Sequence, residues 1–146
     1  MPSIPGLFRL SYLSRNLLSV TEAELGIRDI LAASRRNNPR RGVTGALLFT
    51  ADCFAQVLEG PEAEINALFE RISADPRHAD VLVLEAGPAP AASFAAWSMA
   101  YIGPSAEMAA RFAAIAPGGT APAASAVLGL LQAAVGGLDG QGLAAA

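Results

Sequence analysis

The chain has 146 residues, a formal net charge of -3 and 53% hydrophobic residues, which suffices for one domain with a sizeable core and argues against extensive disorder. Its 10 basic residues are all arginine, and an acidic chain with so few cations is a poor candidate for sequence-independent binding to nucleic acid. The single cysteine, Cys53, excludes an internal disulfide and an all-cysteine metal site.

Targeting signals are not evident in the sequence. The N-terminus lacks the positively charged start and apolar stretch of a signal peptide. The uncharged run between Arg111 and Asp139 is interrupted by Pro117 and Pro122, and the stretch that remains is too short to cross a bilayer of about 30 Å. We therefore expect a cytoplasmic protein that does not span a membrane.

Periodicity and capping residues predict the first elements. Residues 7–13 alternate apolar and polar side chains, which predicts a strand. Residues 21–24 match a capping box and precede apolar residues at helical spacing, so we expect a helix from there to about Arg36. The sequence Asn-Asn-Pro at 37–39 is expected to end it, because the residue before a proline disfavours helical geometry.

The following segments predict four more strands and a second helix. Pro61 is expected at the first helical position of that helix, and Asp75-Pro76 is expected to close it. The strands are expected at residues 43–50, 53–59, 81–85 and 96–102, which are rich in apolar, β-branched or aromatic side chains. The order βαββαββ, with both helices on one face of a sheet, predicts a ferredoxin-like α+β domain over residues 1–103.

Residues 104–146 form an extension of different composition, since alanine and glycine dominate it. Ser105 is expected to cap a first helix, and residues 127–135 predict a second helix that is apolar nearly all round. Such a helix is normally buried. It can cover the open face of its own sheet or contact a partner chain, and we expect both self-packing and a homo-oligomer.

No enzyme motif is present: the sequence lacks a P-loop, a dinucleotide fingerprint and a zinc-binding pattern, and we expect no catalytic or metal-binding residue. The single histidine, His78, is expected at an exposed turn between a helix and a strand. Other polar or aromatic residues fall at predicted interior positions: Gln56 in an apolar strand, Tyr12 at the end of the first strand, and Trp97 and Met99 in the last. Each taken alone has a structural explanation as an edge or core residue.

Taken together, these residues form a pattern that resembles a known family. The segments LFRLSYLS, NNPRRGVTG, FAQVLEG, DPRH and FAAWSM resemble, in the same order, the BLUF domain, a flavin-binding sensor of blue light. The resemblance covers Leu7 to about Ile102, and NNxxxGxTG followed by FxQxLEG is a specific pair of motifs. BLUF domains are themselves ferredoxin-like, which agrees with the order of elements predicted above.

The resemblance implies noncovalent binding of FAD and a role for each matching residue. Tyr12 matches the photoactive tyrosine of the family, and Gln56 matches the glutamine between that tyrosine and the flavin. Trp97 and Met99 match a pair in the last strand that is linked to the signalling state. The residues that match those around the flavin ring are Asn37, Asn38, Arg77 and His78. The cations left for the FAD phosphates are Arg35, Arg36, Arg40 or Arg41.

The leading hypothesis is a short, stand-alone blue-light photoreceptor, not an enzyme, that signals through an unidentified partner protein or through its own oligomeric state. In this hypothesis, electron and proton transfer from Tyr12 rearranges the hydrogen bonds of Gln56. A flavin-dependent redox enzyme is an alternative, although the sequence offers no proton-handling group beyond His78. A ferredoxin-like oligomerisation module that binds no flavin is a further alternative.

Overall fold

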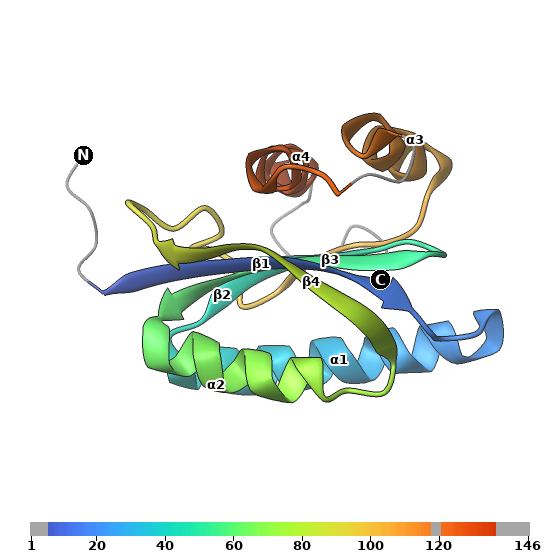
Figure 1. Ribbon diagram of the computed structural model, residues 1–146. Coiled ribbons are helices and arrows are strands. Elements are labelled where there is room, and N and C mark those ends of the chain that lie inside the picture. The colour runs from blue at the N-terminus through green and yellow to red at the C-terminus, as the bar shows by residue number, and fades with distance from the viewer. Residues whose placement is uncertain (1–5, 118–120, 137–146) are drawn as a thin grey trace.

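The computed structural model describes residues 6–117 and 121–136. Within these residues one mixed sheet carries α1 and α2 on one face and α3 and α4 on the other (Figure 1). The elements are β1 (Leu7–Asn16), α1 (Val20–Arg41), β2 (Thr44–Phe49), β3 (Cys53–Pro61), α2 (Glu62–Ser73), β4 (His78–Pro88), β5 (Ala100–Ile102), α3 (Ala106–Ile115) and α4 (Ala124–Gly136). The predicted α+β class and the order βαββαββ are confirmed.

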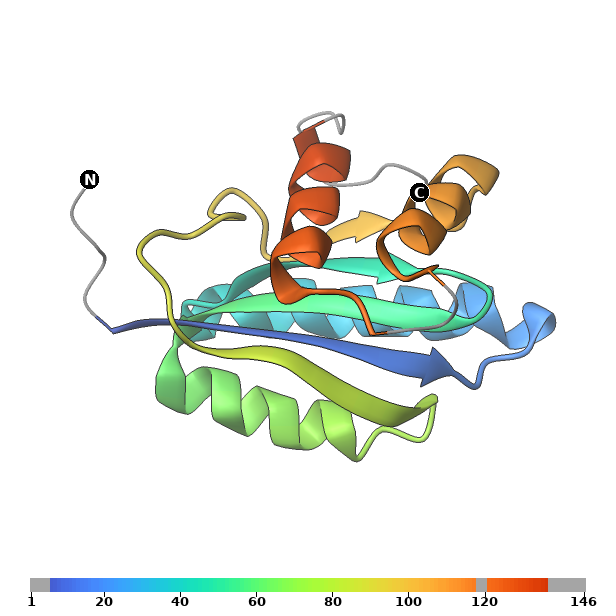
Figure 2. The ribbon, with the colours of Figure 1, turned by 45° about the horizontal axis from the view of Figure 1, so that its top comes forward.

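The strand order is β4-β1-β3-β2-β5. β3 is antiparallel to both β1 and β2, so β1 and β2 run parallel on either side of it and are joined by α1. β1 likewise separates the parallel strands β3 and β4, which are joined by α2. Both connections are therefore strand–helix–strand crossovers with their helices on the same face (Figure 2), and β5 adds parallel to β2 at one edge.

Alternation along the strands divides the buried side chains between two cores. Leu10 and Tyr12 of β1 and Leu58 of β3 belong to the core beneath α1 and α2. Ala46 of β2 and Val57 of β3 belong to the core beneath α3 and α4. Because successive side chains of a strand point to opposite faces, each polar residue in these strands is assigned to one core by its position alone.

The N-terminus of α1 differs from the prediction. Ser19 is the N-cap, and its side-chain oxygen accepts a hydrogen bond from the Glu22 backbone N–H at 3.2 Å. The Glu22 carboxylate in turn accepts from the Ser19 N–H at 3.0 Å. The capping box is therefore real but lies two residues earlier than Thr21, because a second Ser/Thr–Glu pair at the right spacing begins there.

The C-terminus of α1 also lies beyond the predicted end. The helix continues through Pro39 to Arg41 and ends at Gly42, which adopts the left-handed conformation with φ of 71°. A proline in the last turn removes only one helical N–H. The Arg35 and Asn38 side chains donate hydrogen bonds to the chain just before β5, which ties this end of the helix down.

Three further boundaries differ from the sequence prediction. Pro61 is the N-cap of α2, with ψ of 137°, and not its first helical residue. β4 is longer than predicted, whereas β5 is shorter and begins only at Ala100. Trp97 and Met99 consequently precede the last strand instead of lying in it. The segment that carries them is held by side chains and isolated backbone bonds, and not by a strand ladder.

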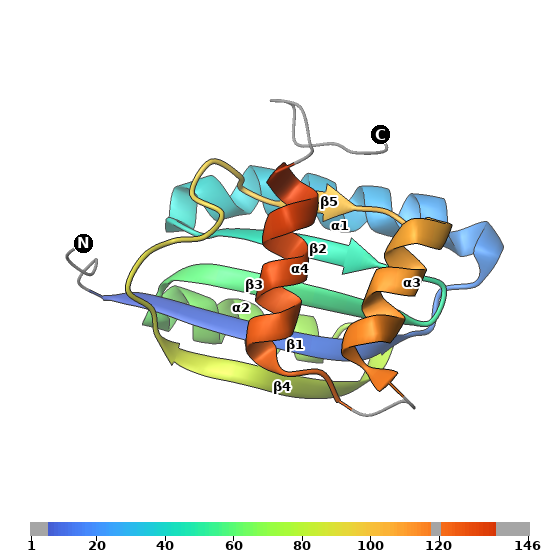
Figure 3. The ribbon, with the colours of Figure 1, turned by 90° about the horizontal axis from the view of Figure 1, so that it is seen from above.

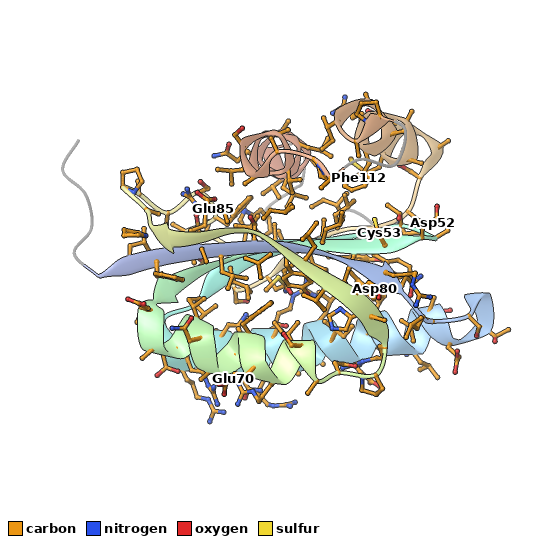
Figure 4. All side chains as sticks on the ribbon, viewed as in Figure 1. Asp52, Cys53, Glu70, Asp80, Glu85 and Phe112 are labelled. Carbon is orange, nitrogen blue, oxygen red and sulfur yellow. The ribbon has the colours of Figure 1, made fainter. Side chains whose placement is uncertain are left out.

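Helices α3 and α4 lie side by side across the second face of the sheet (Figure 3). Ser105 caps α3 as predicted, since its side chain accepts from the Met108 N–H at 3.0 Å. Phe112 of α3 lies between that helix and the sheet (Figure 4), and Val127 and Leu131 of α4 are fully buried there. The apolar α4 therefore covers its own sheet, as the self-packing interpretation predicted.

Two classes of site are missing from the described residues. No helix among them is long and apolar enough to cross a membrane. No group of three or more His, Cys, Asp or Glu residues in the same ranges could hold a metal ion.

Candidate functional site

A cavity of about 340 Å³ lies between α1, α2 and the sheet, and we call it the interhelical cavity. Its apolar walls come from Ile30 of α1, Leu68 and Ile72 of α2, and Leu47 and Leu58 of the sheet. Its polar lining residues are Tyr12, Ser34, Asn37, Asn38, Gln56, Arg71, Asp75, Arg77 and His78. Apolar walls with a few convergent polar groups are typical of a small-molecule site.

A chain of hydrogen bonds runs along the sheet wall of this cavity. Tyr12 and Gln56 are direct cross-strand partners on β1 and β3, and the Tyr12 hydroxyl donates to Gln56 Oε1 at 2.5 Å. The other end of the amide, Gln56 Nε2, donates to the Met99 sulfur at 3.4 Å. All three residues are less than 5% exposed. Both ends of the Gln56 amide are thus engaged by partners of opposite hydrogen-bonding character.

The Tyr12 phenol is held in its protonated form. Burial raises the pKa of Tyr12 well above its usual range, and the negative charge of Asp75 raises it further. The ring packs against Phe69 with centroids 5.7 Å apart and lies edge-to-face with the His78 ring, with centroids 6.0 Å apart. Tyr12 therefore presents a fixed O–H donor to Gln56 across the whole neutral pH range.

The two asparagines at the end of α1 both line the cavity but differ in burial. Asn38 is 2% exposed, and its Nδ2 donates to the Ser98 carbonyl at 2.9 Å. Asn37 is half-buried, and its Oδ1 accepts from Arg40 Nη2 at 2.8 Å. Each of these bonds fixes one end of an asparagine amide and thereby sets the orientation of the whole planar group.

His78 is buried between β1 and α2, which corrects the expectation of an exposed turn histidine. Its Nε2 lies 2.6 Å from the Ile72 carbonyl oxygen, so this nitrogen carries a proton and donates. Its Nδ1 lies 2.7 Å from the Ser14 hydroxyl. In the neutral ring, Nδ1 accepts from that hydroxyl, and the two bonds together fix the ring against Tyr12.

Positive charge at the cavity comes from two arginines of the α2–β4 region. Arg77 Nε donates to Asp75 Oδ1 at 2.9 Å, and its guanidinium holds the pKa of the Asp75 carboxyl below its usual range. Arg71 of α2 also lines the cavity. Four other arginines are the cations predicted for the FAD phosphates, namely Arg35, Arg36, Arg40 and Arg41. None of these four lines the interhelical cavity.

Arg35 faces a different surface. It lines an apolar groove of about 780 Å³ between α1 and the β5 edge, together with Leu31 and Tyr101. Its Nη2 donates to the Met99 carbonyl at 3.1 Å. Arg41 faces Glu64 of α2, with 4.0 Å between nitrogen and oxygen. The basic end of α1 is therefore engaged largely with the protein itself.

The sequence pattern alone does not indicate whether Trp97 or Met99 lies nearer the flavin. In the structure the two side chains lie on different sides of the sheet. Met99 is 1% exposed and lines the interhelical cavity. Trp97 packs against the core beneath α3 and α4, and its carbonyl accepts from the Gly45 N–H at 3.2 Å. Gly45 is required here, because an added Cβ would lie 2.2 Å from the Val57 carbonyl oxygen.

Four polar residues at or beside the cavity are not indicated as site residues by the sequence pattern, and they are Ser14, Ser34, Arg71 and Asp75. Ser14 lies two residues after Tyr12, so the alternation of side chains along β1 predicts that both lie on the same face of the sheet. The sequence pattern indicates only a helix-closing role for Asp75, although its carboxylate accepts from Arg77. Arg71 lies in α2 on the side that faces the cavity, and its spacing from Leu68 was the available signal.

The chain is similar to proteins that sense blue light. The sequence profile of the family described as sensors of blue light using FAD matches residues 7–100. A photoactivated adenylate cyclase subunit alpha-like protein of Euglena gracilis is 38% identical over 95 residues, which cover 62% of this chain and 9% of that protein. The chain thus spans about a tenth of that relative's length.

Solved structures give the same result. The dark-state structure of BlrB, a BLUF protein, is 38% identical with a TM-score of 0.64, and the match covers 77% of this chain and 80% of that one. The photo-activated state of BlsA is 26% identical with a TM-score of 0.74, covering 87% and 93% of the two chains. The profile match spans more than half of the sequence. The chain therefore belongs to the BLUF family of flavin-binding sensors of blue light.

Proposed function

We propose that the chain is a blue-light photoreceptor that binds FAD noncovalently in the interhelical cavity. The observation that carries this proposal is the buried chain of hydrogen bonds from Tyr12 through Gln56 to Met99 at the cavity wall. An oxidisable phenol beside an amide with two exchangeable ends provides the parts of a photochemical switch. The chain itself is proposed to catalyse no reaction.

The residues of the cavity fit a flavin. Ligand pockets typically have volumes of about 300 to 1,000 Å³, and the 340 Å³ here suits a ring system whose attached chain extends outward. Apolar side chains of α1 and α2 would contact the faces of the ring. Beyond the bonds described above, the amides of Asn37, Asn38 and Gln56 each keep a further N–H donor and a further acceptor lone pair, which matches the mixed polar edge of a flavin. Arg77 would complement its carbonyl side.

Tyr12 is proposed to supply the electron and proton of the light reaction. When bound, a photoexcited flavin supplies a strong oxidant. The hydroxyl proton of Tyr12 lies in the hydrogen bond to Gln56 Oε1. When the phenol ring of Tyr12 loses an electron, this proton can therefore move along the existing bond toward Gln56. Electron and proton both return to Tyr12, and the cycle leaves no net chemical change.

Gln56 is proposed to be the part that changes state. Turning its amide, or shifting its tautomer, exchanges the acceptor that faces Tyr12 with the donor that faces Met99. A buried polar network can have two satisfied arrangements of similar energy, and light then changes which one is populated. The altered contact with Met99 carries the change into the chain segment before β5.

The signal is proposed to leave the domain by surface contact in the cytoplasm. We propose residues 1–103 as the photosensor and residues 104–146 as a helical extension, and residues 1–5, 118–120 and 137–146 of these lie outside the described residues. The similar protein of Euglena gracilis is named as like a subunit of a photoactivated adenylate cyclase. By analogy, light would change the affinity of this chain for an effector protein or for a second copy of itself.

The test compares two tyrosine variants in the flavin-loaded protein. Tyr12→Phe removes the hydroxyl that donates to Gln56 and is expected to abolish the light-induced absorption shift while bound flavin is retained. Tyr101→Phe is the matched control, because Tyr101 is the chain's other tyrosine, is buried, and lines the groove instead of the cavity. A normal shift in Tyr12→Phe, or its loss in Tyr101→Phe, would refute the proposed mechanism.

A further inference from the structure

A buried ion pair lies on the face of the sheet opposite the interhelical cavity. Arg9 of β1 and Glu59 of β3 are direct cross-strand partners, and Arg9 Nε donates to Glu59 Oε2 at 3.0 Å. The Arg9 side chain is 10% exposed and that of Glu59 is fully buried. Neither residue lines the cavity, so the flavin site does not account for the pair.

Both charged groups also form hydrogen bonds to one segment of the chain between β4 and β5. Arg9 Nη2 donates to the Ala91 carbonyl at 2.9 Å and to the Ser93 hydroxyl at 3.1 Å. The Glu59 carboxylate accepts from the Ser93 N–H at 2.9 Å and from the Phe94 N–H at 3.0 Å. We call this set of contacts the Arg9–Glu59 clamp.

The clamped segment leads directly to the wall of the cavity. The Trp97 N–H donates to the Phe94 carbonyl at 2.9 Å, and the Trp97 carbonyl accepts from Gly45 of β2. Met99 follows, and its sulfur accepts from Gln56. A loop that is fixed to the sheet on one face therefore delivers a cavity-lining side chain to the other face.

Directional bonds distinguish this arrangement from ordinary core packing. Burying two charges carries a desolvation cost that apolar side chains of similar volume would avoid. Here that cost is offset by charge-assisted hydrogen bonds to two consecutive backbone N–H groups and a carbonyl of the same segment. Such bonds fix where the segment lies along the strands as well as how close it lies, which apolar contact alone does not do.

We propose that the Arg9–Glu59 clamp is a positioning device that holds Trp97 against the α3–α4 core and Met99 against Gln56. Only the effect of this clamp on the light response rests on the proposed function. Loosening the clamp is expected to free both side chains while the Tyr12–Gln56 pair keeps its strand-to-strand register.

The first test replaces the clamp carboxylate by an amide of the same size. Trp97 is the only tryptophan, so acrylamide quenching of its fluorescence in darkness follows this loop without a label. In Glu59→Gln the quenching constant is expected to rise roughly twofold, because a half-buried indole becomes accessible when a locally held segment opens. Two controls accompany it: Arg15→Lys changes an exposed ion pair of β1, the strand that carries Arg9, and Ile65→Ala truncates a buried side chain of α2.

The outcomes separate a positioning role from a general loss of stability. Ile65→Ala lowers the melting temperature without touching the loop, so an equal rise of quenching in this variant would overturn the proposal. Unchanged quenching in Glu59→Gln would overturn it as well. Should Glu59→Gln not fold, Arg9→Lys keeps the positive charge but loses the guanidinium fork that reaches Ala91 and Ser93, and it is expected to give an intermediate rise.

The light response gives an independent second readout in the flavin-loaded protein. The clamp variants are expected to return to the dark spectrum several-fold more slowly than Arg15→Lys, because Met99 no longer stabilises the arrangement of Gln56 seen in the structure. Equal return rates would overturn this part of the proposal. If the wild-type protein shows no light-induced shift, the proposed function fails, and the quenching comparison still decides on the clamp.

Discussion

Removing one hydroxyl from the buried pair of Tyr12 and Gln56 has a predictable cost in stability. Tyr12→Phe keeps the packed ring but leaves Gln56 Oε1 without its donor at a residue that is 4% exposed. A buried acceptor that loses its partner costs about 1 to 3 kcal/mol. We therefore expect the free energy of unfolding of Tyr12→Phe at neutral pH to lie below that of the wild type by this amount.

The same hydroxyl makes this difference depend on pH in a known direction. Burial raises the pKa of the Tyr12 phenol above its ordinary value of 10.0, so above that pH the unfolded chain releases the proton and the folded protein keeps it. The wild type then loses up to about 1.4 kcal/mol per pH unit from this group, and below pH 10 it loses nothing. Tyr12→Phe has no such group, and the two stabilities should converge near about pH 11 to 12.

Urea denaturation followed by circular dichroism in darkness, from about pH 8 to about pH 11, measures how the difference in stability narrows above pH 10. Tyr101 and Cys53 also have pKa values raised by burial, but they are present in both proteins and cancel in the difference. A gap that stays constant over this range would mean that the phenol ionises as readily in the folded protein as in the unfolded chain. That result would refute the buried Tyr12–Gln56 pair.

Three further predictions concern other parts of the molecule. Asn38→Ala is expected to weaken FAD binding about tenfold in a titration of flavin-free protein, since one hydrogen bond is lost; unchanged affinity would contradict its place in the site. Leu131→Ala should lower the free energy of unfolding by about 2 to 5 kcal/mol, whereas a helix that served only a partner would leave the monomer's stability unchanged. Gly42→Ala should lower the free energy of unfolding by about 1 to 2 kcal/mol, because the φ of Gly42 is positive. Gly129→Ala, on the open surface of α4, should raise the free energy of unfolding by about 0.5 to 1 kcal/mol. Changes of the same sign in the denaturation curves of both variants would contradict this prediction.

The order of elements could be predicted because it depends on local periodicity. Alternation in β1 and helical spacing in α2 follow from which face of each element is buried. The same alternation places Tyr12 and Gln56 on one face once β1 and β3 pair, so part of the site follows from the order of strands.

The C-terminal end of α1 could not be predicted, because it is set in part by a contact that is distant in sequence. Pro39 alone indicates a helix end, but the bond from Asn38 to Ser98 and the left-handed Gly42 place that end later. The cost of one proline in a last turn is smaller than the gain from these contacts. Single-sequence patterns carry no information about Ser98 lying next to α1.

For a similar reason, the sequence pattern could not predict whether Trp97 or Met99 lies nearer the cavity. An apolar run before β5 predicts a strand, in which residues two apart face the same side. The actual segment is irregular, because the Gly45 N–H binds the Trp97 carbonyl and the Gln56 amide binds the Met99 sulfur. These contacts turn the two side chains to opposite faces of the sheet.

The most direct test of the central claim is the visible absorption spectrum of the purified protein, in darkness and again under blue light. We expect a flavin spectrum that shifts slightly to the red under illumination and returns in the dark. A flavin that bleaches under light would indicate net reduction and a redox enzyme. A colourless protein that takes up no added FAD would contradict the account altogether and leave a ferredoxin-like module.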